Sequence, residues 1–335
     1  MEKYTAFADP SSGVNPFIPF WLANPPRDSK AVKLLRPLLL CLPLVVLRLP
    51  FLILGMLLLA VSQLLVTVFT LLSAPVGRGL ACLLYPVSAR LVLLGVGVVR
   101  YHKDLADSRR LKIRPIVDPA SFGSSDIILS NYQSLTDVLL LLACWAPRKF
   151  IFVNSAGQAR ILGPIGALLE ACSKNPGQWA PQVAGLPDAE QILDEGAGPY
   201  VIFAEGARTN GTGILRFPKA VDAFVEAARK SGRLGAVGIH YSSKNNCGHY
   251  SPSHTLPIPG ALHTLYQMAQ LYQPATVTWL PCKDTKASTA IQTTTLLSRL
   301  VGRECVDMSE KVDARTAEAF RNYYSQYSVV SKKAE

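Results

Sequence analysis

The sequence predicts an α/β domain with a mostly parallel sheet flanked by helices, preceded by a membrane-embedded helical hairpin. Two observations predict this arrangement. Residues 49–72 are apolar or uncharged throughout, and about 20 apolar residues suffice for a helix to cross the hydrocarbon layer. After residue 100, short apolar runs typical of buried strands alternate with helical patterns. Such alternation favours a mostly parallel sheet.

The apolar block divides the chain into four parts: an irregular segment (1–30), membrane-embedded helices (31–100), the α/β domain (101–330) and a short tail (331–335). The block begins too far from the N-terminus, and is too long, for a cleaved signal peptide. Lys and Arg residues stand on both sides of it, so charge does not favour a single crossing. A hairpin or re-entrant pair with both ends in the cytosol is favoured, and an even number of full crossings would look the same.

The net charge restricts the class of binding partner, and the cysteines indicate the redox compartment. The net charge of +11 fits anionic lipid headgroups or a phosphorylated substrate. Nucleic acid is not expected, because no nucleic-acid motif or basic-aromatic pattern appears. Seven cysteines without a CxxC pair suit a reducing compartment. His240, Cys247, His249 and His254 match no metal-ligand spacing, so neither a metal nor a cofactor is expected.

Strands and helices are expected in a regular order along the domain. Phe17, Phe20 and Trp21 of the first segment either lie at the membrane interface or pack on the domain. The predicted strands cover 126–130, 149–154, 199–206 (running into a turn) and 234–241. The predicted helices cover 135–145, 159–172 (broken near 163–164), 188–196 and 217–232, with a loop over 242–260.

Two polar clusters follow predicted strands: "NYQSLTD" at 131–137 and "EGARTNG" at 205–211. Ligands of open α/β sheets gather at the carboxyl ends of strands, so both clusters are expected to form one site. Gly206 permits close approach by a ligand, and the forked donors of Arg208 suit phosphate. Glu205 could accept from a hydroxyl or orient Arg208.

The two clusters together resemble the glycerolipid acyltransferases of the lysophosphatidic acid acyltransferase type. That family carries Asn-His-x4-Asp and, further on, Phe-Pro-Glu-Gly-Thr-Arg-Ser, where this chain has "NYQSLTD" and "FAEGART". "AVGIHY" (236–241) is similar to a later strand block of the family, with Gly238 in place of Pro. The family's intermediate arginine block is not recognisable near 170–180. The opening "MEKYTAFADPSSGVNPFIP" is also similar to a fungal subgroup, the lysophosphatidic acid:oleoyl-CoA acyltransferases of endoplasmic reticulum and lipid droplets.

The resemblance implies the glycerolipid acyltransferase fold and a 1-acylglycerol-3-phosphate O-acyltransferase. Such an enzyme moves an acyl group from acyl-CoA, a co-substrate, to the sn-2 hydroxyl of lysophosphatidic acid and gives phosphatidic acid. The resemblance also places Asn131, Tyr132 and Asp137 at the reacting centre. Ser134, together with Glu205, Gly206 and Arg208, would bind substrate.

The family's histidine base is replaced by Tyr132 in this chain. Tyrosine has a reference pKa near 10, so it is a poor base at neutral pH, although it can donate to an oxyanion. Three interpretations stay open. Tyr132 could be a weak base, His240 could stand in for it, or the domain could bind lipid without turning it over. Asp137 could then serve only as a helix cap.

Other residues indicate where acyl-CoA would bind and where in the cell the protein would be located. Four basic residues are candidates for binding the CoA phosphates: Arg216, Lys219, Arg229 and Lys230. A solvated helix face fits Arg229 and Lys230 better. Lys332 and Lys333 match the dilysine retrieval signal of endoplasmic reticulum membrane proteins, which predicts a cytosolic tail. The alternative to an enzyme is a lipid-binding scaffold of the same fold at the endoplasmic reticulum or lipid droplet.

Overall fold

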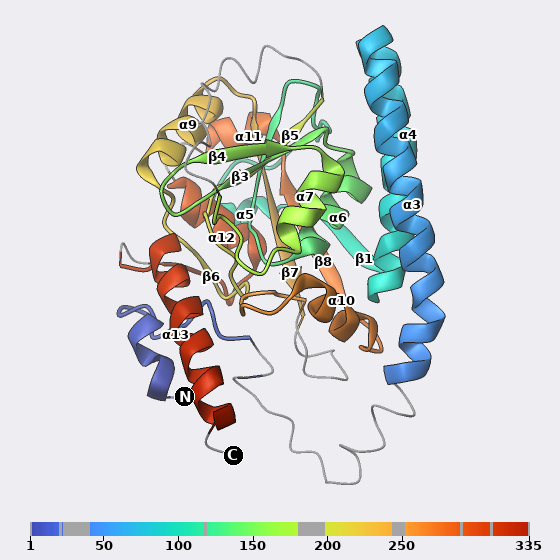
Figure 1. The fold of residues 1–335 in the computed structure, drawn as a ribbon. Coiled ribbons are helices and arrows are strands. Elements are labelled where there is room, and N and C mark those ends of the chain that lie inside the picture. The colour runs from blue at the N-terminus through green and yellow to red at the C-terminus, as the bar shows by residue number, and fades with distance from the viewer. Residues whose placement is uncertain are drawn as a thin grey trace.

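The sheet at the centre of the molecule confirms the predicted fold class (Figure 1). The computed structural model describes residues 2–19, 22, 41–116, 119–179, 198–242, 252–288, 291–308 and 311–333. Strand order is β1-β8-β7-β2-β5-β3-β4. Only the β7–β8 and β3–β4 pairs of this sheet are antiparallel. The strands are β1 (Tyr101–Leu105), β2 (Ile127–Ser130), β3 (Lys149–Val153), β4 (Ala159–Leu162), β5 (Tyr200–Phe203), β7 (Leu234–Tyr241) and β8 (Ala275–Leu280), while β6 (Gly213–Ile214) pairs separately with β9 (Val306–Asp307).

Helices cover both faces of the sheet, which explains why its central strands are apolar on both sides. One face packs against α6 and α7, and α4 lies over α6. The other face packs against α9 and α12. The predicted helix at 217–232 is confirmed, with Val221, Phe224, Val225 and Ala228 on its buried face. The domain helices are α5 (Ser108–Leu111), α6 (Leu135–Trp145), α7 (Pro164–Ala171), α9 (Lys219–Lys230), α10 (Gly260–Met268), α11 (Cys282–Ala287), α12 (Thr293–Val301) and α13 (Ala314–Lys333).

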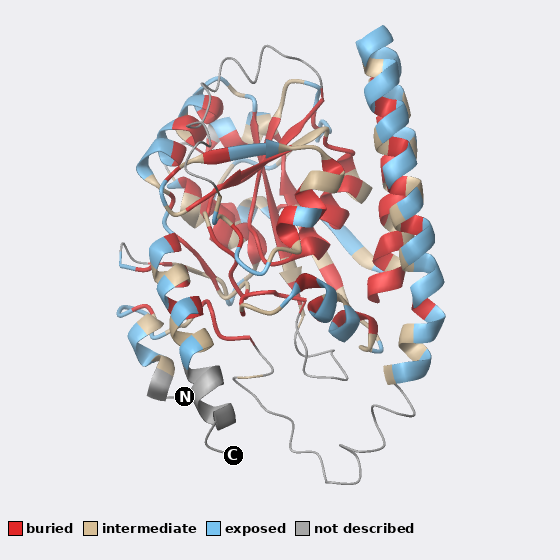
Figure 2. Ribbon diagram, viewed as in Figure 1, coloured by how far each residue is buried: buried red, intermediate tan, exposed pale blue. Residues whose placement is uncertain are grey.

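Two long apolar helices, α3 (Leu42–Leu72) and α4 (Ala74–Val96), form a hairpin that turns at Ser73. Both are long and apolar enough to cross a membrane. Most apolar side chains of α3 are exposed, as the pale blue stretches in Figure 2 show. Polar side chains nevertheless tie the hairpin to the domain. Arg78 donates to the Ala146 carbonyl at the end of α6, and Gln63 accepts from the Ile165 backbone N–H of α7.

The N-terminal segment packs on the domain rather than extending from it. It begins with a 3-10 helix, η1 (Glu2–Phe7). Phe17 is 1% exposed and stacks near Phe320 of α13. Asn210 donates to the carbonyls of Asn15 and Ile18, so the segment is bound to the second polar cluster. Of the two alternatives predicted for the aromatic residues, packing on the domain is confirmed for Phe17. Phe20 and Trp21 lie outside the described residues.

The prediction of one broken helix over 159–172 is wrong in its first part. Residues 159–162 form β4, which pairs with β3 in an antiparallel hairpin. Asn154 closes the turn, because its Oδ1 accepts from the N–H groups of Ala156 and Gln158, and Gly157 takes a positive φ of 78°. This turn chemistry outweighs the helical pattern. The predicted helix at 188–196 lies outside the described residues.

Candidate functional site

The two polar clusters meet because they follow neighbouring strands. β2 and β5 pair in parallel, so their carboxyl ends lie at the same edge of the sheet. The Tyr132 N–H donates to Glu205 Oε1 at 2.9 Å. In return, the Thr209 N–H donates to the Tyr132 carbonyl at 3.0 Å. The structure thus joins the two loops that the sequence predicts to form one site.

Asn131 and Ser134 shape the first loop. The Asn131 amide exchanges two hydrogen bonds with the backbone of Ile239 in β7, at 3.0 and 2.7 Å. Ser134 is the N-cap of α6 and accepts from the Thr136 N–H at 3.1 Å. Both side chains are fully buried and fix the backbone of the loop.

Asp137 closes the capping box of α6. Its Oδ2 accepts from the N–H groups of Gln133 and Ser134 at 2.5 and 2.8 Å. Its Oδ1 accepts from the Tyr241 hydroxyl at 2.5 Å. Burial raises the pKa of Asp137 to about 6, although these donors favour its ionised form. The carboxylate therefore caps the helix, with Tyr241 as its side-chain partner.

Tyr132 turns its ring into the core of the domain. The ring centroid lies 4.7 Å from that of Phe203 and 5.5 Å from that of Phe152. The hydroxyl is buried and has no hydrogen-bond partner among the described residues. Burial raises the pKa of Tyr132 far above its ordinary value, with Arg208 acting in the opposite direction. The phenol stays protonated at neutral pH, so it can donate a hydrogen bond, and its raised pKa disfavours a role as base.

Glu205 holds the second loop to the first. Besides the Tyr132 N–H, it accepts from the Leu215 N–H through Oε2 at 3.1 Å. Burial raises the pKa of Glu205 to about 8, against both backbone donors. Gly206 has a φ of 71°, and a Cβ at this position would stand 3.1 Å from the Asn154 carbonyl oxygen. Only glycine fits this turn without strain.

Arg208 is 2% exposed, and most of its hydrogen bonds are made within the protein. Its guanidinium donates to the carbonyls of Ala171 and Ser173, each at 2.9 Å. It also donates to His254 Nδ1 at 2.6 Å. The Nε–H has no hydrogen-bond partner among the described residues. Arg208 therefore joins the second loop to the end of α7, with one donor left over.

Two histidines beside Arg208 were not predicted as site residues. The ring of His254 stacks on that of His263 with centroids 4.3 Å apart. Burial and the nearby Arg208 lower the pKa of His254 to about 2, so the ring is neutral and its Nε2–H donates to the Ile258 carbonyl at 2.8 Å. His254 and His263 stand in or after a segment that reads as a polar loop, and only the folded chain brings them to Arg208.

His240 does not face the two clusters. Val237, Ile239 and Tyr241 of β7 point to the α6 side of the sheet, and neighbouring strand residues point to opposite faces. His240 accordingly lies on the α12 side, where its Nδ1 is 3.5 Å from the position that a Cβ on Gly302 would occupy. We therefore do not propose His240 as a substitute base.

The four basic candidates for the donor phosphates lie in different environments. Arg216 and Lys219 line a surface pocket of about 490 Å³, together with Arg315, Asp313 and the N-terminal turn of α9. Lys230 is exposed at the end of α9.

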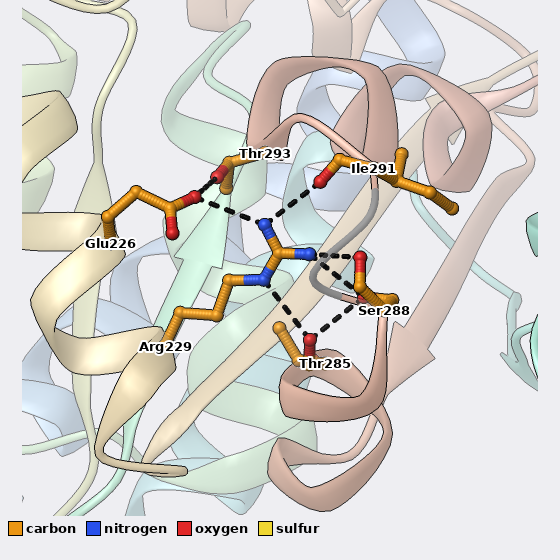
Figure 3. Close-up of polar contacts among 6 residues, drawn as sticks. All are labelled: Glu226, Arg229, Thr285, Ser288, Ile291 and Thr293. Carbon is orange, nitrogen blue, oxygen red and sulfur yellow. Dashed lines mark hydrogen bonds and ion pairs between the residues drawn. The ribbon is translucent and has the colours of Figure 1, made fainter.

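Arg229 is 1% exposed and neither solvated nor available to a ligand. As Figure 3 shows, its guanidinium donates to the carbonyls of Thr285, Ser288 and Ile291 and contacts Glu226. The expectation of a solvated face is wrong for this residue. It satisfies carbonyls in the last turn of α11 and just after the helix, where an unpaired C-terminal end would be costly.

Among the described residues, no group of three His, Cys, Asp or Glu side chains could hold a metal ion. Cys247 and His249 lie outside the described residues.

Asp137→Asn is expected to flatten the dependence of stability on pH. The pKa of Asp137 rises from 3.8 to about 6 on folding. The unfolded state therefore ionises first, and the wild-type protein loses stability as pH rises from about 4 to 6, by about 1.4 kcal/mol per unit. The amide oxygen of asparagine can still accept from the N–H groups of Gln133 and Ser134, and its amide nitrogen can donate to the Tyr241 hydroxyl. The variant should be more stable above pH 6 by up to about 3 kcal/mol.

Denaturation of the detergent-solubilised protein between pH 4 and 7 would measure this difference. Asp222→Asn, at an exposed carboxylate of α9, removes the same charge and is the matched control. Parallel stability curves for wild type and Asp137→Asn would contradict the prediction.

Comparison with known proteins finds similarity at the level of structure and not of sequence. No protein-family model matches the sequence, and no curated protein matches it significantly. The fold is similar to the crystal structure of the 1-acyl-sn-glycerophosphate (LPA) acyltransferase, PlsC, from Thermotoga maritima. The TM-score is 0.42 at 16% identity, over 86% of this chain and 98% of that chain. The fold class rests on the sheet and its helix layers.

Proposed function

We propose that the protein is a membrane-bound acyltransferase that moves an acyl group from acyl-CoA to the sn-2 hydroxyl of lysophosphatidic acid. The observation that carries this proposal is a pair of buried donors without partners, the Tyr132 hydroxyl and the Arg208 Nε–H. Buried polar groups are almost always paired, and Arg208 is near enough to Tyr132 to act on its pKa. An oxygen of the substrate would satisfy both donors.

In this proposal Tyr132 donates to the oxygen of the thioester carbonyl as negative charge develops on it. The sn-2 hydroxyl attacks the thioester carbon, the carbon–sulfur bond breaks, and the thiol of CoA leaves with a proton. Preorganised donors of this kind are worth about 10²–10³ in rate. A catalytic base is absent from the position where the family has histidine, so we expect turnover to be slow. General-base help is typically worth about 10²–10⁴.

Arg216 and Lys219 are proposed to bind the phosphates of CoA. They line the same pocket as Arg315 and the first turn of α9, and partial positive charge at a helix N-terminus adds to that of the side chains. Asp313 also lines this pocket. Its Oδ1 accepts from the N–H groups of Arg315 and Thr316, so part of its charge is satisfied locally.

The α3–α4 hairpin is proposed to attach the protein to one side of the bilayer. Arg48 contacts the domain at α10 and Gln63 contacts it at α7. These residues are 15 positions apart, so the domain lies beside about 22 Å of α3. A bilayer core is about 30 Å thick, so a full crossing would immerse the domain. A hairpin lying in one leaflet leaves both ends on the same side.

Lys332 and Lys333, at the end of α13, support an endoplasmic reticulum location with a cytosolic domain. The proposed partners are lysophosphatidic acid, acyl-CoA and membrane lipids. A location at lipid droplets is proposed only from the similarity of the first residues to the fungal subgroup.

A non-catalytic lipid-binding role is the second candidate. It is favoured because all the oxygens of Asp137 and Glu205 accept hydrogen bonds from the protein, which leaves neither carboxylate dedicated to a substrate. Such a protein would bind lysophosphatidic acid and release no phosphatidic acid.

Product formation by the wild-type protein separates the two candidates, and Tyr132→Phe tests the role proposed for the hydroxyl. The ring contacts with Phe203 and Phe152 are retained, and an unpaired buried hydroxyl is removed, so stability should stay equal or rise by about 1–2 kcal/mol. Formation of labelled phosphatidic acid from oleoyl-CoA and lysophosphatidic acid should fall by about 10²–10³. Tyr241→Phe, which removes a hydroxyl that does have a partner, should instead lower stability by about 1–3 kcal/mol.

One outcome counts against the enzyme and another against the role of Tyr132. If the wild-type protein forms no product above a protein-free reaction but binds lysophosphatidic acid, the acyltransferase proposal fails and the binding role stands. If Tyr132→Phe turns over as fast as the wild type, the role given to the hydroxyl is wrong.

A further inference from the structure

Helix α10 exposes an apolar face. Leu262, Leu265 and Tyr266 are 41%, 46% and 47% exposed, and their spacing places them on one side of the helix. Leu271, just beyond its end, is 49% exposed. The opposite side, with His263 and Gln267, is buried. The pale blue surface of α10 is visible in Figure 2 beside the lower end of the hairpin.

Arg48 of α3 fixes the position of α10. Its guanidinium donates to the carbonyls of Met268 and Leu271, each at 2.7 Å, and to that of Gln270. The orphan carbonyls at the end of α10 are thereby satisfied by a side chain of the apolar hairpin. Arg48 is itself 7% exposed, so this link is a buried one.

The C-terminal end of α4 also contacts Arg48 and the residues that follow α10. Gly97 has a φ of 96°, and a Cβ there would stand 2.9 Å from the Arg48 Nη1. The Gln273 N–H donates to the Gly97 carbonyl at 3.2 Å. α10 is therefore held against the open end of the hairpin, where Val46 and Leu47 of α3 are 62% and 66% exposed.

We propose that α10 is a second membrane-contacting element, with Leu262, Leu265 and Tyr266 inserted into the headgroup–acyl boundary of the bilayer that holds α3. An apolar helix face of this kind is typical of interfacial helices, and tyrosine is enriched at that depth. One face of a nine-residue helix is also far smaller than the roughly 800 Å² that each partner of a stable protein complex buries. The inference rests on the proposed attachment of the hairpin to one leaflet.

Tryptophan quenching in the full chain tests the contact. Tyr266→Trp and, as a second substitution, Leu265→Trp are reconstituted into phosphatidylcholine vesicles whose acyl chains are brominated near the headgroup. Fluorescence beyond that of the wild type is measured with brominated lipid and with aqueous acrylamide. Leu57→Trp on α3 reports the hairpin, and Lys230→Trp on α9 is the matched control, because α9 lies across the domain from α3 and α4 in Figure 1.

The added fluorescence at 265 and 266 should fall roughly twofold or more with brominated lipid, as at 57, while that at 230 responds only to acrylamide. Quenching at 57 without quenching at 265 or 266 overturns this inference and leaves the hairpin attachment standing. Shielding of 265 and 266 from both quenchers means that protein covers α10, which also overturns it. Without quenching at 57, the proposed attachment fails and this inference fails with it.

Discussion

Arg208→Ala is expected to lower the free energy of unfolding by about 3 kcal/mol. The substitution would leave the carbonyls of Ala171 and Ser173 and the Nδ1 of His254 without their donor. The Ala171 carbonyl and His254 Nδ1 are buried, so water cannot easily replace the guanidinium there, whereas the Ser173 carbonyl is partly buried. Denaturant unfolding of the detergent-solubilised protein would measure the loss.

Two further variants define what Arg208 does. Arg208→Lys keeps the charge but cannot reproduce a planar fork that reaches both carbonyls, so most of the loss should remain. Arg315→Ala removes an exposed arginine and should change stability by less than about 0.5 kcal/mol. A fully stable Arg208→Ala protein would contradict the bonding described here.

This expected loss changes how the activity of Arg208 variants should be interpreted. An inactive Arg208→Ala protein would not by itself demonstrate phosphate binding, because the loop carrying Glu205 and Gly206 would lose an anchor. Only a variant shown to be folded, and still defective in binding lysophosphatidic acid, would support a direct contact.

Gly238→Ala is expected to cost about 3 kcal/mol or more. A Cβ at this position would stand 2.4 Å from the Leu300 carbonyl carbon and 2.5 Å from the Val301 backbone nitrogen. Both atoms belong to the backbone of α12, which cannot move by a rotamer change. The helix would have to separate from β7, losing the packing of Leu297 and Val301 in the second core cluster.

A thermal unfolding series would measure this cost, with Gly79→Ala as the matched control because a Cβ on Gly79 meets no atom within 4 Å. Equal unfolding temperatures for Gly238→Ala and the wild type would mean that α12 does not approach β7 this closely. The acyltransferase family that the sequence resembles has proline at this position. In this chain β7 is an inner strand between β8 and β2, where proline would lack a ladder donor.

The sequence predicted the strand and helix elements with strong periodicity. The buried runs at 126–130 and 234–241 became β2 and β7, and the amphipathic pattern at 217–232 became α9. These predictions succeed because the hydrophobic period is a local property of the chain. The strand at 159–162 was missed, since its pairing with β3 depends on a turn that Asn154 closes.

The sequence by itself determined that two polar loops follow strands, and that a long apolar segment precedes them. Strand order alone then brought the loops together. Only the tertiary structure decided what each side chain does there: Asp137 caps α6 and takes the Tyr241 hydroxyl, Arg208 reaches the end of α7, and His240 faces away. The physical reason is that a hydrogen-bond partner and a sheet face depend on segments distant in sequence, which no local pattern specifies.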